Sequence, residues 1–501
     1  MKKFVAIIIA TTAILTTAST AFASDGDLDS TWGGTGVVVS AHSDSSAAYA
    51  IANYPGDRVL VVGVVTDSPA SRILVNRFLA DGSADTSCNG TGEFIDSVND
   101  AVASDVVVLA DGSFVVAGTI QLNNVGTLFV AKFTNTCEID GSFGSGGFAN
   151  YSAHFGTFGR ALVVQSDGKI IVVGDEYPTV SDSSDQRILV TRFSSMGVLD
   201  VSFGNNGRFV SSSDEKGQAQ DVVLDDNGGI IFVGSIVGNL APSAAIVGRL
   251  TNTGSLDTSF ATQGYLIDEF NGDPQLDAIA IRPNGNLVAV GTRGTYGGPS
   301  PSAQQSLIVV CLTQAGAFDS DCGVNGWAYF PTANSSVFAK DIFLTSDNRI
   351  LVSGAIEDDT VQPIVLRLNY DGTPDNSFAT LGTWRGTSLL GGMFSVTIQS
   401  DGRILAAGGL ETQGTMSVGV VRLANTVITP STTTTTTTTP SSITSTTAAP
   451  LVATTSVAPQ STTIAADQLP ATGRDENSLM FAVAFFGFGI LLFGLRRRAL
   501  R

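Results

Sequence analysis

One short phrase recurs seven times along this chain of 501 residues, and it constrains the fold more than any other feature. Its clearest copy runs from Leu199-Asp200 through Phe203-Gly204 to a further glycine, Gly207. The aspartates of the seven copies are Asp29, Asp85, Asp140, Asp200, Asp257, Asp319 and Asp375, at a mean spacing of about 58 residues. A period of this length indicates one small structural unit repeated seven times.

Two further phrases stay in step with the first. The second is Asp-Gly or Asn-Gly followed by an apolar run that ends in glycine, and its terminal glycines are Gly63, Gly118, Gly174, Gly234, Gly291, Gly354 and Gly408. The third is an apolar run ending in a basic and then an apolar residue, with the bases Arg77, Lys132, Arg192, Arg249, Arg367 and Arg422. Cys311 takes the place of the base in the sixth unit.

Each unit contains four short apolar runs, which in the third unit are 147–152, 160–165, 169–174 and 187–193. Asp167-Gly168 predicts a hairpin with a type I′ turn, because glycine accepts positive φ without strain. Four antiparallel strands in each of seven units predict an all-β chain, a seven-bladed β-propeller over residues 24–424. An open β-solenoid is the alternative.

The ends of the repeat region favour the closed ring. The region begins inside one copy of the first phrase, at Leu28-Asp29, and it ends at Arg422-Leu423. A pair of this kind precedes the first phrase in the other units, with Cys311 in place of the base in the sixth, so joining the two ends would complete a blade. The three phrases resemble the delta-60 repeat family of bacterial surface and secreted proteins over nearly all of 25–423. This resemblance implies a structural repeat and brings no activity with it.

The N-terminus has the pattern of a secretory signal peptide. Lys2 and Lys3 precede an apolar run over 4–15, and small residues follow up to Ala21-Phe22-Ala23. A basic start, a short apolar core and an A-x-A site are typical of an export signal. We expect cleavage between Ala23 and Ser24, so that 1–23 is removed. An uncleaved anchor is the alternative.

The C-terminus combines three elements in order. They are the pentapeptide Leu469, Pro470, Ala471, Thr472 and Gly473, an apolar segment over 479–495, and an arginine-rich tail to Arg501. Together, 469–501 resembles an LPxTG cell-wall sorting signal. As a helix, 479–495 would reach about 26 Å, close to the thickness of the hydrocarbon layer. The arginines would keep the tail cytoplasmic.

The sorting resemblance implies a covalent partner and an address. A sortase would cleave between Thr472 and Gly473 and transfer Thr472 to an amine of the peptidoglycan precursor, with contact to the membrane only transient through 479–495. The chain would then be secreted and anchored to the wall of a Gram-positive-type bacterium. The alternative is a single-pass anchor that keeps its membrane helix.

Residues 425–468 are rich in Thr, Ser, Ala and Pro and include eight consecutive threonines, Thr432–Thr439. Such a segment holds too little apolar surface to form a core, so we expect an extended stalk. Whether its threonines carry O-linked glycans stays open.

Charge and cysteines narrow the function classes. The net charge is −19, and removal of both processed ends would make it more negative, so no nucleic acid is expected as a partner. In an exported chain the four cysteines form up to two disulfides. The repeat alignment favours Cys88–Cys137 and Cys311–Cys322, because Cys88 and Cys322 replace the aromatic residue of the first phrase and Cys311 the base of the third.

No residue stands out as a catalytic group, a cofactor ligand or a metal ligand. The seven aspartates are interpreted as acceptors for turn N–H groups and as partners of the strand-ending bases, with loop-bound calcium as the alternative. His42 and His154 are the two histidines of the chain, too few for a His-ligated site. We therefore expect no cofactor, and a protein that is not an enzyme.

The predicted role is a surface-displayed binding or adhesion module for an unidentified extracellular ligand. Loops on a rigid propeller are suited to binding, and the longer connections are 175–185, 236–244 and 293–305. A structural wall or surface-layer component without a ligand is the second hypothesis. An extracellular enzyme acting on glycans is the third.

Overall fold

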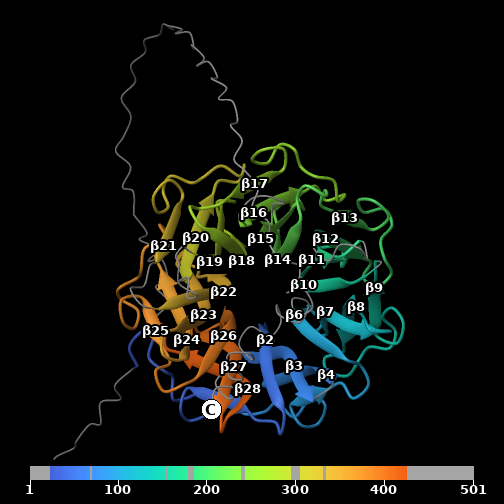
Figure 1. Ribbon diagram of the computed structural model, residues 1–501. Helices are drawn as coiled ribbons and strands as arrows, with labels where there is room; N and C mark the ends of the chain where they lie inside the picture. The colour runs from blue at the N-terminus through green and yellow to red at the C-terminus, as the bar shows by residue number, and fades with distance from the viewer. Residues whose placement is uncertain are drawn as a thin grey trace, which may run out of the picture. The chain divides into compact units, whose positions relative to one another are not determined.

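The computed structural model describes residues 23–67, 70–153, 155–178, 185–237, 243–294, 305–330 and 335–425. Within these ranges the chain forms 28 β-strands in seven antiparallel sheets of four strands, arranged as blades around a central axis (Figure 1). No helix is present in the described ranges. The expected all-β, seven-bladed propeller is confirmed, whereas the stalk and the C-terminal sorting segment lie outside the described residues.

The strands occupy four concentric positions. The inner strands are β2 (Ser45–Tyr54), β6 (Ala101–Val108), β10 (Thr157–Val164), β14 (Gly217–Leu224), β18 (Asp273–Ile281), β22 (Ser336–Leu344) and β26 (Gly391–Ile398). The second strands are β3 (Arg58–Asp67), β7 (Phe114–Leu122), β11 (Ile170–Glu176), β15 (Ile230–Val237), β19 (Leu287–Gly294), β23 (Ile350–Glu357) and β27 (Ile404–Thr412).

The third strands are β4 (Ala70–Phe78), β8 (Val125–Phe133), β12 (Arg187–Phe193), β16 (Ser243–Leu250), β20 (Gln305–Leu312), β24 (Val361–Leu368) and β28 (Thr415–Leu423). The outer strands are β5 (Glu93–Ile95), β9 (Phe148–Tyr151), β13 (Arg208–Val210), β17 (Tyr265–Asp268), β21 (Trp327–Phe330), β25 (Thr383–Arg385) and β1 (Val37–Ser40). Blades 1 to 7 are numbered from β2, and each contains one strand of each position.

The ring closes through the two ends of the repeat region. β1 pairs antiparallel with β28, with Val37 opposite Val421, so the N-terminal segment supplies the outer strand of blade 7. The inner strands also contact one another around the whole ring, including β26 with β2. Closure by joining the ends is therefore confirmed, and the open solenoid is excluded.

Blade boundaries differ from the sequence units in one respect. The run at 147–152, assigned above to the third unit, contains β9, which is the outer strand of blade 2. The first run of each sequence unit belongs to the preceding blade. Each unit therefore spans two blades, which links neighbouring blades covalently and by pairing.

The expected hairpin at Asp167-Gly168 is present, but its turn type was predicted wrongly. Gly168 has φ of +80°, whereas Asp167 stays in the ordinary negative region. The N–H of Gln165 donates to the carbonyl oxygen of Lys169 at 2.8 Å, and the carbonyl oxygen of Gln165 accepts from the N–H of Gly168 at 2.9 Å. The turn is thus a type I turn followed by a left-handed glycine, the usual three-residue hairpin loop.

A β-bulge explains the seven glycines that end the second phrase. Each inner strand carries one bulge, which lies opposite that glycine, for example between Gly159 and Ala161 opposite Gly174. A Cβ added at Gly174 would lie 1.8 Å from the carbonyl oxygen of Phe158, and the six equivalent glycines show approaches of 1.9–2.0 Å. Glycine is required here by close backbone approach and not by positive φ.

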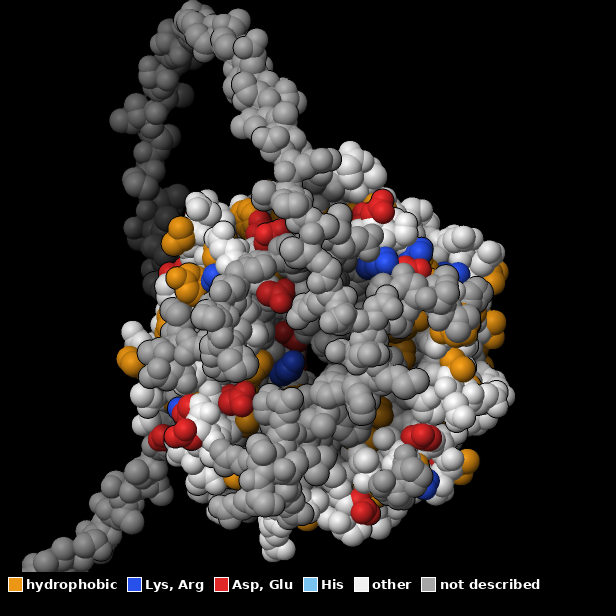
Figure 2. All heavy atoms as spheres, viewed as in Figure 1, with side chains coloured by type: hydrophobic (Ala, Val, Ile, Leu, Met, Phe, Trp, Pro, Cys, Tyr) orange, Lys and Arg blue, Asp and Glu red, His pale blue; other side chains and the backbone are white. Residues whose placement is uncertain are grey.

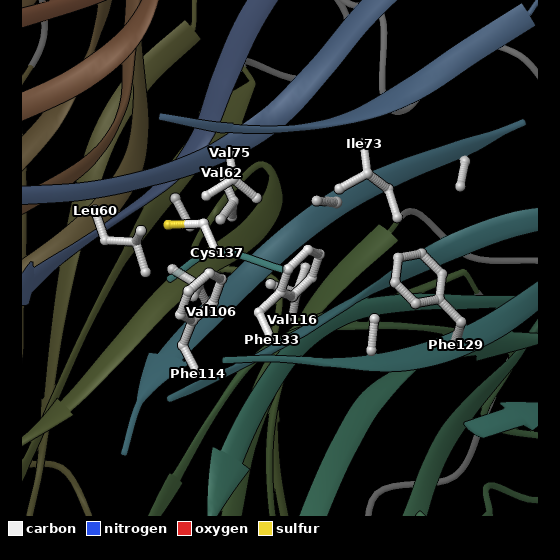
Figure 3. Close-up of a cluster of buried hydrophobic side chains, with 14 of the residues drawn as sticks. Leu60, Val62, Ile73, Val75, Val106, Phe114, Val116, Phe129, Phe133 and Cys137 are labelled. Atoms are coloured by element: carbon white, nitrogen blue, oxygen red, sulfur yellow. The ribbon is translucent and has the colours of Figure 1, made fainter. Parts of the chain in front are cut away.

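The core consists of seven apolar clusters, one between each pair of neighbouring blades. Figure 3 shows the cluster between blades 1 and 2, where Leu60 and Val75 face Phe114 and Phe133. The rings of Phe114 and Phe133 stack with centroids 5.0 Å apart. Because every blade is covered on both sides, its strands are nearly continuous apolar runs.

The ring has two faces. The turn face carries the hairpins between first and second strands and the loops from third to outer strands. The loop face carries the connections between second and third strands and those from blade to blade. Both ends of the described ring lie on the turn face, where Gly26 N–H donates to Ala424 and Asn425 donates to Gly402, each at 2.8 Å.

Two disulfides reinforce this arrangement. Cys88–Cys137 joins blades 1 and 2 across 49 residues, and Cys311–Cys322 closes an 11-residue loop within blade 5. Both pairings are those that the repeat alignment favours. Within the described ranges, no helix is long and apolar enough to cross a membrane.

Candidate functional site

The first phrase builds a structural ion-pair series on the turn face. Its aspartate pairs with the base that ends the third strand, at 2.7 Å for Arg77–Asp85, 2.9 Å for Arg192–Asp200 and 2.8 Å for Arg367–Asp375. Lys132–Asp140, Arg249–Asp257 and Arg422–Asp29 repeat the contact. In blade 5, which lacks the base, Asn286 donates to Asp319 at 2.9 Å. The predicted pairing is confirmed.

Every group of the phrase is engaged. The second oxygen of Asp200 accepts from the hydroxyl of Ser202 at 2.6 Å, and this bond, with the charge of Arg192, lowers the pKa of Asp200 to about 2. Arg192 also donates to the carbonyl of Asn252 in the next blade at 2.6 Å and lies over the buried ring of Phe203. The residues of the phrase therefore connect neighbouring blades and have a structural role.

A surface hollow of about 710 Å³ is lined by these same groups. It lies on the turn face between blades 4 and 5 and is bordered by Arg249, Asp257 and Gln314. Arg249 donates to Asp257 at 2.8 Å and to the carbonyl of Gln314 at 2.9 Å. The polar groups of the hollow are thus hydrogen-bonded within the protein, and the hollow is a weak candidate for a ligand-binding site.

The central channel holds a different set of side chains. The bulge in each inner strand projects one extra residue, and these seven, here called the channel ring, are Tyr49, Ser104, Arg160, Gln220, Asp277, Lys340 and Phe394. All seven are partly exposed. Figure 2 shows a hollow at the centre of the ring with acidic and basic side chains around it. One structural position therefore presents seven different side chains.

The charged half of the channel ring centres on Asp277. Its Oδ1 accepts from Gln275 at 2.9 Å and from Lys340 at 3.3 Å, whereas Oδ2 is buried with no hydrogen-bond partner among the described residues. The side chain of Asp277 is only 7 % exposed. Burial raises its pKa, and the charges of Lys340 and Arg160 oppose that rise. Arg160 itself pairs with Asp175 at 2.7 Å.

The opposite half is aromatic. Tyr49 of blade 1 and Phe394 of blade 7 lie with ring centroids 5.7 Å apart and planes inclined by 31°. Burial raises the pKa of Tyr49 to about 12, so its hydroxyl is neutral at physiological pH. This pair gives the channel an apolar wall beside the polar one.

Three more aspartates lie next to the bulge in alternate blades, and these axial aspartates are Asp105, Asp221 and Asp341. Each carboxylate accepts two backbone N–H groups, one from its own strand and one from the next inner strand. Asp221 binds Val222 at 2.7 Å and Ile279 at 2.8 Å.

Burial raises the pKa of Asp105 to about 7 and that of Asp221 to about 8, and the charge of Asp341 adds to both shifts. Because blades 2, 4 and 6 are not neighbours, their carboxylates influence one another across the channel. The axial aspartates therefore hold neighbouring inner strands together. The variable lining of the channel is the channel ring.

Several residues singled out from the sequence fall outside this site. Ala21, His154 and the sorting residues Leu469, Pro470, Ala471, Thr472 and Gly473 lie outside the described residues. Ala23 and Ser24 are described and exposed. In the described part of the chain, no group of three or more His, Cys, Asp or Glu side chains is placed to hold a metal ion.

His42 has partners that the sequence did not suggest. Its ring nitrogens lie 3.0 Å from the hydroxyl of Ser46 and 2.9 Å from Glu93, a Ser-His-Glu chain. Ser46 is only 2 % exposed, and its oxygen also accepts the N–H of Val418 at 3.2 Å. A buried hydroxyl that already accepts a hydrogen bond is a poor nucleophile. We therefore interpret the hydrogen bonds of Ser46, His42 and Glu93 as a structural link between blades 7 and 1.

An aromatic group on the outer wall of blade 5 was also missed. Trp327 and Tyr329 lie on one side of β21 with centroids 5.8 Å apart, and Phe270 packs against Trp327 at 5.5 Å. Arg293 lies over the ring of Tyr329. Tyr329 is 49 % exposed, so this outer-wall cluster is reachable from solvent.

One comparison with known proteins matches part of the chain to a β-propeller family. The model of a family described as "Domain of unknown function (DUF5122) beta-propeller" matches residues 165–203 and 345–378. No curated protein matches the sequence.

Three solved structures show a limited similarity to this chain. The polysaccharide lyase Uly1 is 9 % identical, with 75 % of this chain and 89 % of that chain covered and a TM-score of 0.46. A sialidase from Trypanosoma rangeli is 10 % identical, with 77 % and 57 % covered and a TM-score of 0.34. The GH93 alpha-L-arabinofuranosidase of Fusarium graminearum is 10 % identical, with 77 % and 96 % covered and a TM-score of 0.35.

These structures correct one expectation. The chain was predicted not to be an enzyme because no residue of its sequence stood out as catalytic. That prediction is contradicted, since the similar structures include a polysaccharide lyase, a sialidase and an arabinofuranosidase. At this level of similarity they do not indicate which chemistry, if any, this chain performs. Any activity of this chain has to be argued from its own residues.

Proposed function

We propose that this chain is a secreted surface protein, linked by a sortase to peptidoglycan through Thr472, that displays its propeller as a ligand-binding module. The observation that carries the binding role is the channel ring. Seven equivalent positions bear seven different side chains, although the blades around them are built from repeated ones. Side chains that differ among equivalent sites suit recognition better than architecture.

The placement of the chain ends supports display. Asn425, the last described residue, lies on the turn face, bonded to Gly402. The longer connections at 175–185, 236–244 and 293–305 each follow a second strand and therefore start from the loop face. A stalk that begins at residue 425 would start from the turn face, which is the face opposite these connections.

Mass spectrometry of material released from purified walls by a muramidase tests the anchoring. We expect a C-terminal fragment ending at Thr472 and carrying wall peptide. A chain that retains 474–501 and is found only with membranes would contradict the sortase linkage. That result would leave the propeller tethered by its apolar segment.

Arrays of glycans and extracellular proteins, probed with the purified full chain, test the binding role. We expect at least one ligand whose signal falls when the channel ring is altered. If a correctly folded chain finds no ligand on either array, the structural wall component becomes the better hypothesis.

A glycan-acting enzyme is the second candidate, and Asp277 is the observation that favours it. A buried carboxyl with a raised pKa and one unoccupied oxygen is the kind of group that donates a proton to a glycosidic oxygen. Release of reducing ends from polysaccharides, followed in the wild type and in Asp277→Asn, tests this. Equal rates in the two proteins would remove Asp277 from consideration.

A further inference from the structure

We infer that the channel ring is a binding site for a neutral sugar ring, held between the aromatic pair Tyr49 and Phe394 and the polar side chains opposite. This inference rests on the proposed binding role and names its site and ligand class. It is independent of wall anchoring.

The aromatic half provides one side of such a site. Tyr49 and Phe394 come from adjacent blades, with ring centroids 5.7 Å apart, and both are partly exposed in the channel. The C–H face of a pyranose is apolar enough to lie against aromatic carbon, because it leaves water without losing hydrogen bonds. A small linear polar ligand would gain little from this surface.

The polar half offers unused hydrogen-bonding groups. The Oδ2 atom of Asp277 is buried and has no hydrogen-bond partner among the described residues, and the side chain is only 7 % exposed. Such an oxygen is costly unless something binds it. Ser104 and Gln220 show no side-chain hydrogen bond to any described residue. A carboxylate oxygen, a hydroxyl and an amide together match the mixed donors and acceptors of sugar hydroxyls.

Charge selects against the other ligand classes. A cation approaching Asp277 would meet Lys340, whose ammonium lies 3.3 Å from the carboxylate, and the nearby guanidinium of Arg160. An anion would meet the carboxylate of Asp277, which is already paired with Lys340. A neutral polyhydroxylated ring meets neither repulsion and can use both the acceptor and the donor of the Asp277–Lys340 pair.

A hollow of about 510 Å³ lies over the turn-face ends of β26, β2 and β6, and its lining, which includes Asn53, Leu109 and Ile398, holds none of the seven channel-ring side chains. The room for a sugar ring is therefore the hollow at the centre of the propeller (Figure 2) and not this surface pocket.

Saturation-transfer NMR and calorimetry on the purified full chain test the inference, with cellobiose, maltose and di-N-acetylchitobiose as probes. We expect at least one disaccharide to bind, and its affinity to fall at least tenfold in Tyr49→Ala and in Asp277→Asn. Tyr329→Ala on the outer wall and Asp358→Asn on the surface are the matched controls. Both controls should bind like the wild type.

Two results would overturn the inference and are distinguishable from failure of the proposed function. Disaccharide binding that falls only in Tyr329→Ala would move the site to the outer-wall cluster while leaving a binding protein. Absence of binding by all three disaccharides, in a chain with wild-type thermal unfolding, would reject a sugar site in the channel. The wall-release and array experiments would still decide display and binding separately.

Discussion

The turn face and the channel ring are built from the same seven repeats, yet they differ in how much the repeats agree. On the turn face, Asp200 and its equivalents pair with the base that ends the third strand in nearly every blade. In the channel ring, the equivalent position is aromatic in blades 7 and 1, cationic in blades 3 and 6 and acidic in blade 5. At positions where packing determines the residue type, the repeats carry the same residue. At positions that packing does not constrain, the residue type differs from repeat to repeat.

The largest expected effect follows from breaking one turn-face pair. Arg367 has a fully buried side chain that pairs with Asp375 at 2.8 Å and also bonds Ser377 and Asp25. Arg367→Met would leave Asp375 largely buried with one cation fewer, and we expect a loss of about 4 kcal/mol in the free energy of unfolding.

Chemical denaturation with Lys132→Met as the matched control measures that effect. Lys132 and Asp140 form the same pair but are each 23 % exposed, so the control should lose less than about 1 kcal/mol. Similar losses in the two variants would mean that burial does not govern the strength of the turn-face pairs.

Close backbone approach at the bulge gives the next largest effect. Gly174→Ala places a methyl group 1.8 Å from the carbonyl oxygen of Phe158, so the bulge that projects Arg160 must shift. We expect a loss of about 3 kcal/mol from overpacking. Gly141→Ala, where nothing lies within 4 Å of the added carbon, should change little and controls for backbone entropy.

The two regions should respond to pH with opposite signs. The pKa of Asp200 is lowered to about 2, so its contribution to stability is present above the ordinary value near 4 and is lost as pH falls toward 2. The pKa of Asp221 is raised to about 8 by burial, so its contribution is greatest below pH 4 and is lost as pH rises through 8.

Denaturation midpoints at pH 5, 7 and 9 test the channel side of this contrast. We expect the wild type to lose on the order of 2 kcal/mol between pH 5 and 9, and Asp221→Asn to flatten part of that slope. A wild-type stability that rises with pH over this range would show that the two N–H donors outweigh burial at the axial aspartates.

Much of the turn face follows from the sequence, because its phrases combine local signals. Asp-Gly before an apolar run marks a hairpin, and Asp200 lies eight positions after Arg192, which is its ion-pair partner. The closing of the ring also follows, since Leu28-Asp29 and Arg422-Leu423 are the two parts of one interrupted unit.

The channel ring could not be predicted from the sequence, because a bulge is defined by the pairing with its partner strand and not by its own residues. One signal was available. Every ring residue stands 14 positions before the glycine that ends the second phrase, as Tyr49 does before Gly63 and Asp277 before Gly291. The constant distance marks the position, and its changing residue type indicates that it is not needed for packing.

The smallest stability effects are expected at Ser104 and Gln220, and they sharpen the comparison most directly. Both side chains are partly exposed and hold no side-chain hydrogen bond within the described residues, so Ser104→Ala and Gln220→Ala should stay within about 0.5 kcal/mol of the wild type. If the channel ring serves recognition, the same substitutions should weaken disaccharide binding several-fold in calorimetry. A loss of stability without a loss of binding would place these residues with the architecture, and the divergence of the ring would then reflect absence of constraint and not selection for a ligand.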